Sequence, residues 1–310
     1  MMRRLLVLLS LLVLAAVQPA HSAQLKLGIL PAADTIVLHV AADEGLFAKQ
    51  GLEVELVPFQ SALELGAAMR AGALSGHFGD IINVLMQNES GSPQAIVATT
   101  SHSSPDRCFG LVVSPKSKAQ TLADLKGKDI AVSSATIIDF LLAQLLQQEG
   151  AAPDFLNRQD IRQIPVRLQM LLSGQIESAL LPEPLVSLVE AKGARTILND
   201  CKLNTPLAVI ALKRDVLDAP DGAQTVAKFR EALREAAKRI NETPDAYRPI
   251  MEAKGLLPKG ASANYTMVRF DMTHTPTGLP SEADIKTFAD WMKANRILKK
   301  DPAYGDVVFQ

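Results

Sequence analysis

The 310-residue sequence has few aromatic residues, little net charge and no pattern of metal ligands. Aromatic residues make up 5% of it, and 32 Lys and Arg against 33 Asp and Glu give a formal net charge of −1. This balance provides no general basic field for nucleic acid or for an anionic membrane surface. The five His and two Cys show no spacing typical of a zinc site. We therefore expect no nucleic acid, metal or other cofactor as a partner.

Long apolar runs are also scarce, and the one that stands out is near the start. Two Arg occur in residues 1–4, and residues 5–17 are apolar except for Ser10. This run is shorter than the roughly 20 residues that a membrane span needs, and small residues follow it. The pattern predicts a cleaved signal peptide over residues 1–23, with an uncleaved anchor as the alternative. An exported protein is expected, periplasmic in a bacterium with two membranes.

From Gln24 onward, short β-like runs alternate with helical runs, which is typical of α/β proteins with mainly parallel sheets. At this length, division into two domains is expected. The runs that favour strands are residues 25–30, 53–57, 76–79, 95–100, 109–113, 130–132 and 179–181. Those that favour helices are residues 37–50, 62–71, 137–149, 223–241, 245–254 and 281–295.

Two segments share one pattern, RAGALSGHFGD at residues 70–80 and LSGQIESALLPE at residues 172–183. In each, a Gly ends a helix, a short strand leads to an acidic residue, Asp80 or Glu183, and a second helix follows. Because ligands collect at the carboxyl ends of strands in open α/β sheets, two such edges predict a cleft between two lobes. The alternative is that both carboxylates are solvated turn residues.

The order and spacing of three motifs resemble a known family. The motifs are VAADEGLFAKQGLEV at 40–54, DLKGKDIAV at 124–132, and LSGQIESA at 172–179 followed by Glu183-Pro184. They are similar to the nitrate/sulfonate/taurine group of substrate-binding proteins of ABC importers, from about residue 25 to about residue 212. The resemblance implies a two-lobed type II periplasmic-binding-protein fold, in which each lobe has a mixed, mostly parallel sheet with flanking helices and two hinge strands join the lobes.

The same resemblance implies lobe boundaries and a disulfide. Lobe 1 would comprise residues 24–106 and 205–310, and lobe 2 residues 107–204. Cys108 and Cys201 would lie on the two crossings between the lobes, which run side by side in this fold. We expect them to pair in the oxidising periplasm, with two buried free thiols as the alternative. The implied partners are a small-molecule ligand and an ABC permease with its ATPase, and a monomer is expected.

Three loops after strand ends supply hydroxyl groups and helix N-termini, which can bind anions or polar oxygens. In the first, Asp34 or Thr35 can cap the following helix, and in the second Ser61 and Glu64 have capping-box spacing. The alternative is that each hydroxyl only caps its own helix. The predicted ligand-binding residues are Asp34, Thr35, Gln60, Ser61, Asp80, Ser133, Ser134, Thr136 and Glu183.

The charge of these loops does not favour a bare anion. Two carboxylates in one cleft would repel it, the loops hold no basic residue, and the nearest basic candidate is Arg107. These loops therefore favour a ligand with N–H donors or a positive end, and the expected solute is a small polar organic molecule or an anion bound between the lobes.

The alternative function is an enzyme of the same fold that acts on a pyrimidine or a menaquinone precursor. General acid–base catalysis needs a group whose pKa lies near the operating pH. The pyrimidine-synthase relatives carry a His among their active-site residues, whereas the first loop here offers Asp34 and Thr35. His39 and His77 are expected to be packed in the core, so a binding protein and not an enzyme is predicted.

Overall fold

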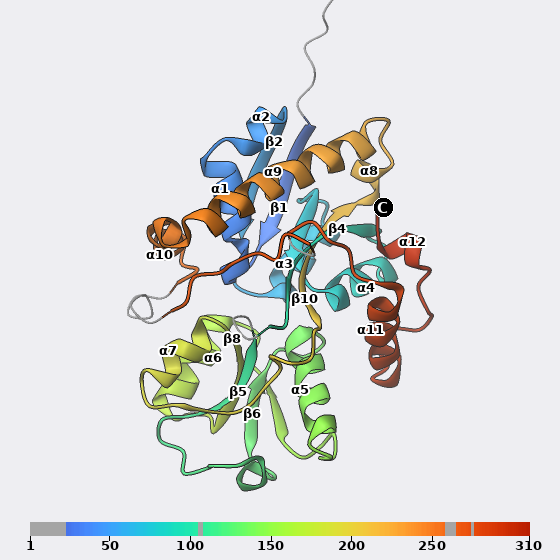
Figure 1. Ribbon diagram of the computed structural model, residues 1–310. Coiled ribbons are helices and arrows are strands. Elements are labelled where there is room, and N and C mark those ends of the chain that lie inside the picture. Colours follow the sequence, from blue (N-terminus) through green and yellow to red (C-terminus); the bar gives the residue numbers. More distant parts are fainter. Residues whose placement is uncertain (1–22, 105–107, 258–264, 274–275) are drawn as a thin grey trace, which may run out of the picture.

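The computed structural model describes residues 23–104, 108–257, 265–273 and 276–310, and its two β-sheets form the cores of two lobes (Figure 1). The predicted signal peptide, apart from Ala23, lies outside the described residues, as does Arg107. In the described part of the chain, no helix is long and apolar enough to cross a membrane.

The first lobe contains a five-stranded sheet in the order β2-β1-β3-β10-β4. Its strands are β1 (Ala23–Ile29), β2 (Leu52–Pro58), β3 (Gly76–Gly79), β4 (Gln94–His102) and β10 (Pro206–Lys213). The strand β1 is parallel to β2 and β3, whereas β10 is antiparallel to both of its neighbours. One side packs against α1 (Ile36–Asp43), α2 (Leu46–Lys49) and α9 (Gly222–Glu242), and the other against α4 (Ile81–Glu89) and α11 (Glu282–Ala294), with α3 (Ala62–Arg70) beside α4.

The second lobe repeats this plan with the sheet order β7-β6-β8-β5-β9. Its strands are β5 (Phe109–Val113), β6 (Asp129–Val132), β7 (Asn157–Asp160), β8 (Ser178–Pro182) and β9 (Arg195–Asn199). The strand β5 is antiparallel to β8 and β9, as β10 is in the first sheet. The helices are α5 (Ile137–Gln148), α6 (Ile164–Ser173) and α7 (Leu185–Glu190). Because β3 and β8 are both third in their sheets, the pattern shared by residues 70–80 and 172–183 marks equivalent parts of the two lobes.

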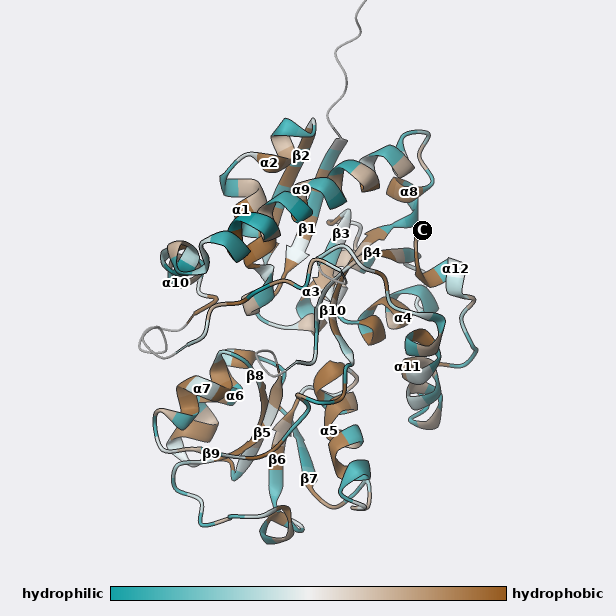
Figure 2. Ribbon diagram, viewed as in Figure 1, coloured by the Kyte–Doolittle hydropathy of each residue, from teal (hydrophilic) through white to brown (hydrophobic). Residues whose placement is uncertain are grey.

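The long helix α9 shows how the sequence pattern produces the packing. Its buried residues recur every three or four positions, at Val226, Phe229, Leu233, Ala237 and Ile240, and its other face is hydrophilic (Figure 2). The ring of Phe229 stacks on that of Phe47 in α2, with centroids 5.2 Å apart. This apolar stripe holds α9 against the first sheet.

Several local predictions need correction. The predicted helix over residues 37–50 is two helices, because Gly45 adopts a left-handed conformation (φ 66°) between α1 and α2. The predicted helix over residues 245–254 is a 3-10 turn, Pro244–Tyr247, followed by α10 (Arg248–Ala253). The pattern shared by residues 70–80 and 172–183 implies α4, α6 and α7 without giving their bounds. The sequence predictions do not include β7, β9 and β10, the short elements α8 (Arg214–Leu217) and α12 (Tyr304–Val307), or two 3-10 turns, Ala33–Thr35 and Leu122–Leu125.

The chain crosses between the lobes twice, and the two crossings are linked. A disulfide joins Cys108 to Cys201, whose Cα atoms are 4.8 Å apart. Ser103 and Thr205 exchange hydrogen bonds nearby, from the Ser103 N–H to the Thr205 carbonyl (2.8 Å) and from the Thr205 N–H to Ser103 Oγ (3.0 Å). The crossings therefore run side by side where the lobes meet.

Candidate functional site

A cavity of about 130 Å³ lies between the lobes and is lined by residues of both. Leu30, Leu65 and Phe78 line it from the first lobe, and Phe109 and Ile164 from the second. Tyr265 and Val268 add to its wall from the C-terminal segment. The wall is therefore largely apolar, as in most small-molecule sites, and the few polar groups on it decide specificity.

The predicted ligand-binding residues divide into two groups. Thr35, Gln60 and Ser134 do not line the cavity: Thr35 is fully buried, Gln60 is exposed and Ser134 is half-buried. The residues that do line it are Asp34, Ser61, Asp80, Ser133, Thr136 and Glu183.

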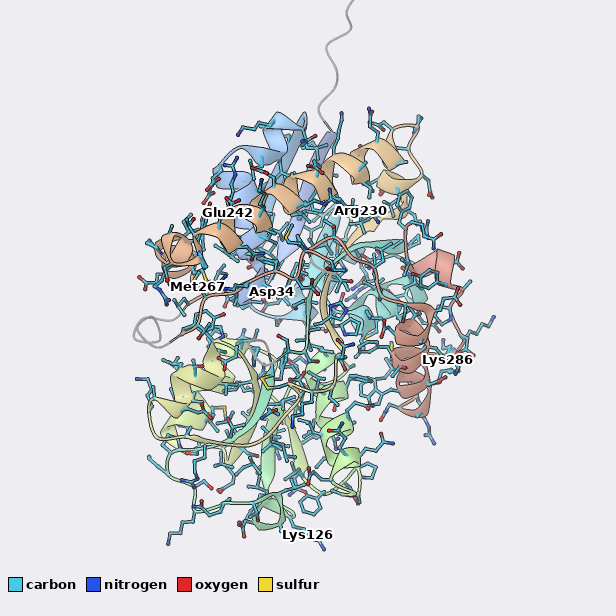
Figure 3. All side chains as sticks on the ribbon, in the orientation of Figure 1. Asp34, Lys126, Arg230, Glu242, Met267 and Lys286 are labelled. Carbon is cyan, nitrogen blue, oxygen red and sulfur yellow. A yellow bond between two sulfur atoms is a disulfide. The ribbon has the colours of Figure 1, made fainter. Side chains whose placement is uncertain are left out.

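Asp34 lies at the edge of the first lobe that faces the second (Figure 3). Its Oδ2 accepts hydrogen bonds from Thr100 Oγ1 (2.8 Å) and Ser101 Oγ (2.9 Å) on β4. Thr35 Oγ1 donates to the Ala32 carbonyl at 2.7 Å, and neither side chain caps α1. The predicted capping role of Asp34 or Thr35 is wrong, because hydroxyl groups of β4 and a nearby carbonyl bind these side chains instead.

Ser61 both caps a helix and lines the cavity. Its Oγ accepts from the Glu64 N–H at 3.3 Å, at the start of α3. In the predicted capping box, Glu64 would accept a hydrogen bond from the Ser61 N–H. Instead, Glu64 Oε2 accepts from the N–H of the preceding residue, Gln60, at 3.2 Å. Gln60 therefore contributes its backbone to the turn.

Four N–H groups at the start of α5 donate to side chains of the chain itself. The N–H groups of Ser134 and Ala135 donate to Asp160 Oδ1 (3.0 Å) and Asp139 Oδ2 (3.2 Å). That of Ile138 donates to Thr136 Oγ1 at 3.2 Å. The N–H of Ile137, the first residue of the helix, donates to Asp80 of the other lobe at 3.0 Å. A ligand therefore finds no free N–H among these groups.

Asp80 and Glu183 both face the cavity, as the sequence predicts for a cleft. The other carboxylate oxygen of Asp80 accepts from the Asn83 N–H at 2.7 Å and so caps α4. Both oxygens of Glu183 accept from Ser187, one from its Oγ (3.0 Å) and one from its N–H (3.2 Å). Burial raises the pKa of each carboxyl, and the hydrogen bonds partly oppose that rise.

Arg167 of α6, which is not among the residues predicted from the sequence, is a buried cation on the second-lobe wall of the cavity. Its residue is 1% exposed, and Nη1 donates to Ser133 Oγ (3.2 Å) and to the Ile161 carbonyl (3.0 Å). Its Nε has no hydrogen-bond partner, and none of the ion pairs recorded among the described residues involves it. Burial lowers its pKa to about 10, so the guanidinium stays charged at neutral pH.

A sequence signal for Arg167 does exist. It follows Ile164 by three positions and precedes Leu171 by four, so an apolar helical stripe carries one cation. The other arginine of the cavity wall, Arg162, is paired through its Nε with Asp160 at 2.7 Å.

Neither His39 nor His77 lines the cavity, and burial lowers the pKa of each to about 4, so both are neutral at pH 7.

The family model described as NMT1/THI5 like matches residues 32–247, which is more than half of the chain. The chain belongs to the NMT1/THI5-like family. Among curated proteins, none matches the sequence.

Solved structures share the fold of this NMT1/THI5-like chain. The alkanesulfonate-binding protein SsuA from Xanthomonas axonopodis pv. citri, bound to MOPS, is 21% identical with a TM-score of 0.78, over 94% of this chain and 99% of that one. The periplasmic aliphatic sulphonate binding protein SsuA from Escherichia coli is 17% identical with a TM-score of 0.74, over 93% and 92%. The desulfurization enzyme DSZB is 15% identical with a TM-score of 0.63, over 92% and 96%.

These likenesses establish the fold. The predicted two-lobed periplasmic-binding-protein architecture and the resemblance to the nitrate/sulfonate/taurine group are confirmed. Because binding proteins and an enzyme share this fold, the function has to be argued from the cavity.

Proposed function

We propose that this protein is the exported substrate-binding component of an ABC importer and that its solute is an organic anion with an apolar body. The observation that carries this proposal is Arg167, a buried guanidinium in the wall of the inter-lobe cavity with an unpartnered Nε. The two relatives named as sulfonate-binding proteins support a binding role.

Arg167 favours an anionic group on the solute. The charge of Asp160 acts on Arg167 without a direct ion pair. A buried charge without a direct ion pair costs free energy, and a bound carboxylate or sulfonate supplies one through charge-assisted hydrogen bonds. The carboxylates of the wall already accept hydrogen bonds from the chain, Asp34 from two hydroxyls, Asp80 from two N–H groups and Glu183 from Ser187. Of the solutes that the sequence analysis considers, this geometry favours an organic anion over a ligand with N–H donors.

The apolar wall favours an organic body over a small inorganic anion. Contact between apolar ligand surface and side chains such as Leu65, Phe78 and Ile164 favours binding, by roughly 25 cal/mol per Å² of apolar surface buried. Nitrate has no apolar surface and would leave these side chains against water. The solute that matches both features has one anionic end and an aliphatic or aromatic remainder.

Closure of the lobes would link binding to delivery. Ligand contacts from Phe78 in one lobe and Arg167 in the other can form together only when the lobes are closed, so the ligand shifts the population toward the closed state. A permease with its ATPase could then distinguish loaded from empty protein. A cleaved signal peptide over residues 1–23 and a periplasmic location complete this proposal.

The experiment is a titration of ligand-stripped protein with matched pairs of compounds, each an aliphatic or aryl sulfonate or carboxylate beside its neutral amide or alcohol, with nitrate and amines included. We expect only the organic anions to raise the melting temperature, with about 2.7 kcal/mol of stabilisation at a free concentration of about 100 times Kd. Recovery of the ligand unchanged would separate binding from catalysis. Stabilisation by neutral partners or amines alone, or chemical conversion of the ligand, would contradict the proposal.

Arg167→Met tests the residue itself. Removal of one partner of a buried charge pair costs about 2–5 kcal/mol, so we expect at least roughly a 30-fold loss of affinity for the anion. Arg158→Gln is the matched control, because Arg158 lies in the same lobe, pairs with Asp139 at 3.0 Å and does not line the cavity. Equal losses in the two variants would argue against Arg167 as the anion partner.

A further inference from the structure

The carboxylate of Asp80 joins two helices that belong to different lobes. One oxygen accepts from the Asn83 N–H at the start of α4 in the first lobe. The other accepts from the Ile137 N–H at the start of α5 in the second lobe. Asp80 is 7% exposed and lines the cavity, so this double cap is part of the ligand site.

The start of α5 would otherwise be a binding place for an anion. It is a twelve-residue helix, and the positive end of its dipole and its first N–H groups point toward the inter-lobe region. Asp80 places a carboxylate there from the opposite lobe. A sulfonate or carboxylate that approached Ile137 would meet a fixed negative charge and an N–H that is already bonded.

Arg167, a cation on the wall of the same cavity, has no such bond from the opposite lobe among the described residues. Arg167 is buried, lines the same cavity from α6, and its Nε lacks a partner. The chain thus places its own carboxylate at the start of α5 and leaves the Nε of Arg167 available.

We infer that Asp80 is a specificity-determining residue, a built-in anion that closes the α5 N-terminus to anionic groups and directs the anionic end of the solute to Arg167. This inference deepens the proposed function and rests on it, because Arg167 is taken as the partner of the solute. It also specifies orientation. The apolar body of the solute extends from Arg167 toward Asp80, where an anionic group on the far end is rejected.

Asp80→Ser separates the two capping roles of the carboxylate. Serine is among the best N-cap residues, so it keeps the bond to the Asn83 N–H and with it the start of α4. Its shorter, neutral side chain does not reach Ile137 and carries no charge. The variant therefore releases the α5 N–H while α4 stays capped.

Inorganic sulfate is the probe, since its use does not depend on the identity of the natural solute. At pH 8, calorimetric titration should show that Asp80→Ser binds sulfate at least tenfold more tightly than the native protein. In the double variant Asp80→Ser, Ile137→Pro this gain should disappear, because proline at the first position of a helix is tolerated and has no N–H. Sulfate affinity equal to that of the native protein in a folded Asp80→Ser variant would overturn the inference, as would a gain that survives Ile137→Pro.

Circular dichroism establishes that each variant is folded. If Asp80→Ser does not fold, Asp80→Asn replaces it, because the amide has the same shape, is neutral and can accept from one of the two N–H groups. The expected gain in sulfate affinity is then at least threefold, and no gain counts against the inference. The Arg167→Met titration with organic anions is separate, so failure of the proposed function and failure of the Asp80 inference give different results.

Discussion

Asp80 and Glu183 occupy equivalent places in the two sheets but bind partners in different lobes. Each directly follows the third strand of its sheet, β3 or β8. Both bonds to the Glu183 carboxylate come from Ser187 in the same lobe, whereas one of the two bonds to Asp80 comes from Ile137 in the other lobe. The two lobes have the same arrangement of strands, but this hydrogen bond between them is accepted by Asp80 of the first lobe and not by Glu183 of the second.

The unliganded protein is therefore expected to open when Asp80 is changed. A second direct polar contact between the lobes is an exposed bond of 3.4 Å from Gln163 Nε2 to Glu64 Oε1. Small-angle scattering without ligand should show a larger radius of gyration for Asp80→Ser than for the native protein. Gln163→Ala is the control and should change the radius less, because its contact is exposed to solvent. Identical scattering from the native protein and Asp80→Ser would show that the Asp80 bond does not hold the lobes together.

Ser133 and Ser134 are adjacent residues for which the geometry predicts different effects. Ser133 Oγ accepts from Arg167 and lies on the cavity wall, whereas the Ser134 side chain does not line the cavity. Ser133→Ala should weaken binding of the organic anion by about 2–10-fold, the equivalent of about 0.5–1.5 kcal/mol for one hydrogen bond. Ser134→Ala should leave the affinity within twofold of native. A larger loss for Ser134→Ala in calorimetric titration would instead support the role that the sequence predicts for Ser134.

Asp200 makes the stability of the protein depend on pH in a direction opposite to that of most carboxylates. It is fully buried, accepts from the Phe109 N–H at 2.6 Å, and burial raises its pKa to about 6. Between the unfolded value near 4 and this folded value, the unfolded state binds fewer protons, so its contribution to stability falls as pH rises through that window. A shift of about two units corresponds to about 3 kcal/mol.

Asp200→Asn should remove this penalty and keep an acceptor for the Phe109 N–H. The variant should be more stable than the native protein at pH 7.5, by up to about 3 kcal/mol, and show no advantage near pH 4. His39 and His77, whose pKa values are lowered to about 4, destabilise both proteins alike as pH falls below 6.5. The quantity to measure by urea unfolding is therefore the difference between variant and native at each pH. An advantage that is equal at both pH values would contradict the assignment to Asp200.

The disulfide between Cys108 and Cys201 should contribute strongly to stability. The two residues are 93 positions apart, and in the chain-entropy model a loop of this length corresponds to about 4–5 kcal/mol. The double variant Cys108→Ser, Cys201→Ser should lose up to this amount in urea unfolding. Alkylation of the exported protein without reduction, followed by mass spectrometry, checks the bond directly. Two modified thiols would show that the cysteines are free.

The sequence predicts the parts of the fold that depend on local patterns. The alternation of strands and helices, the pattern that places β3 and β8, and the acids that follow them can all be recognised along the chain. The strand β10 is not predicted, because its largely apolar sequence PLAVIALK is compatible with a buried strand or a buried helix. The assignment is decided by pairing with β3 and β4, which are far away in the sequence.

The candidate site is predictable to a smaller extent, for the same reason. Loops after strand ends point to Asp34, Ser61 and Ser133, because their position relative to a strand is a local property. Arg167 lies inside a helix, and its burial depends on how α6 packs in the second lobe. The bond from Ile137 to Asp80 spans 57 positions and exists only when two lobes meet, so no local pattern contains it.

All five strands of the second sheet come from one continuous stretch, residues 109–199, and the disulfide joins the chain just outside its two ends. The first sheet, in contrast, is completed by β10 only after that stretch has ended. We propose lobe boundaries at residues 107 and 204 on this basis. The second lobe is then a cassette that recombination could exchange in a single event. A chimaera that receives this cassette from a relative would acquire a different anion-holding wall in place of Ser133 and Arg167, while Asp34 and Asp80 of the recipient remain unchanged.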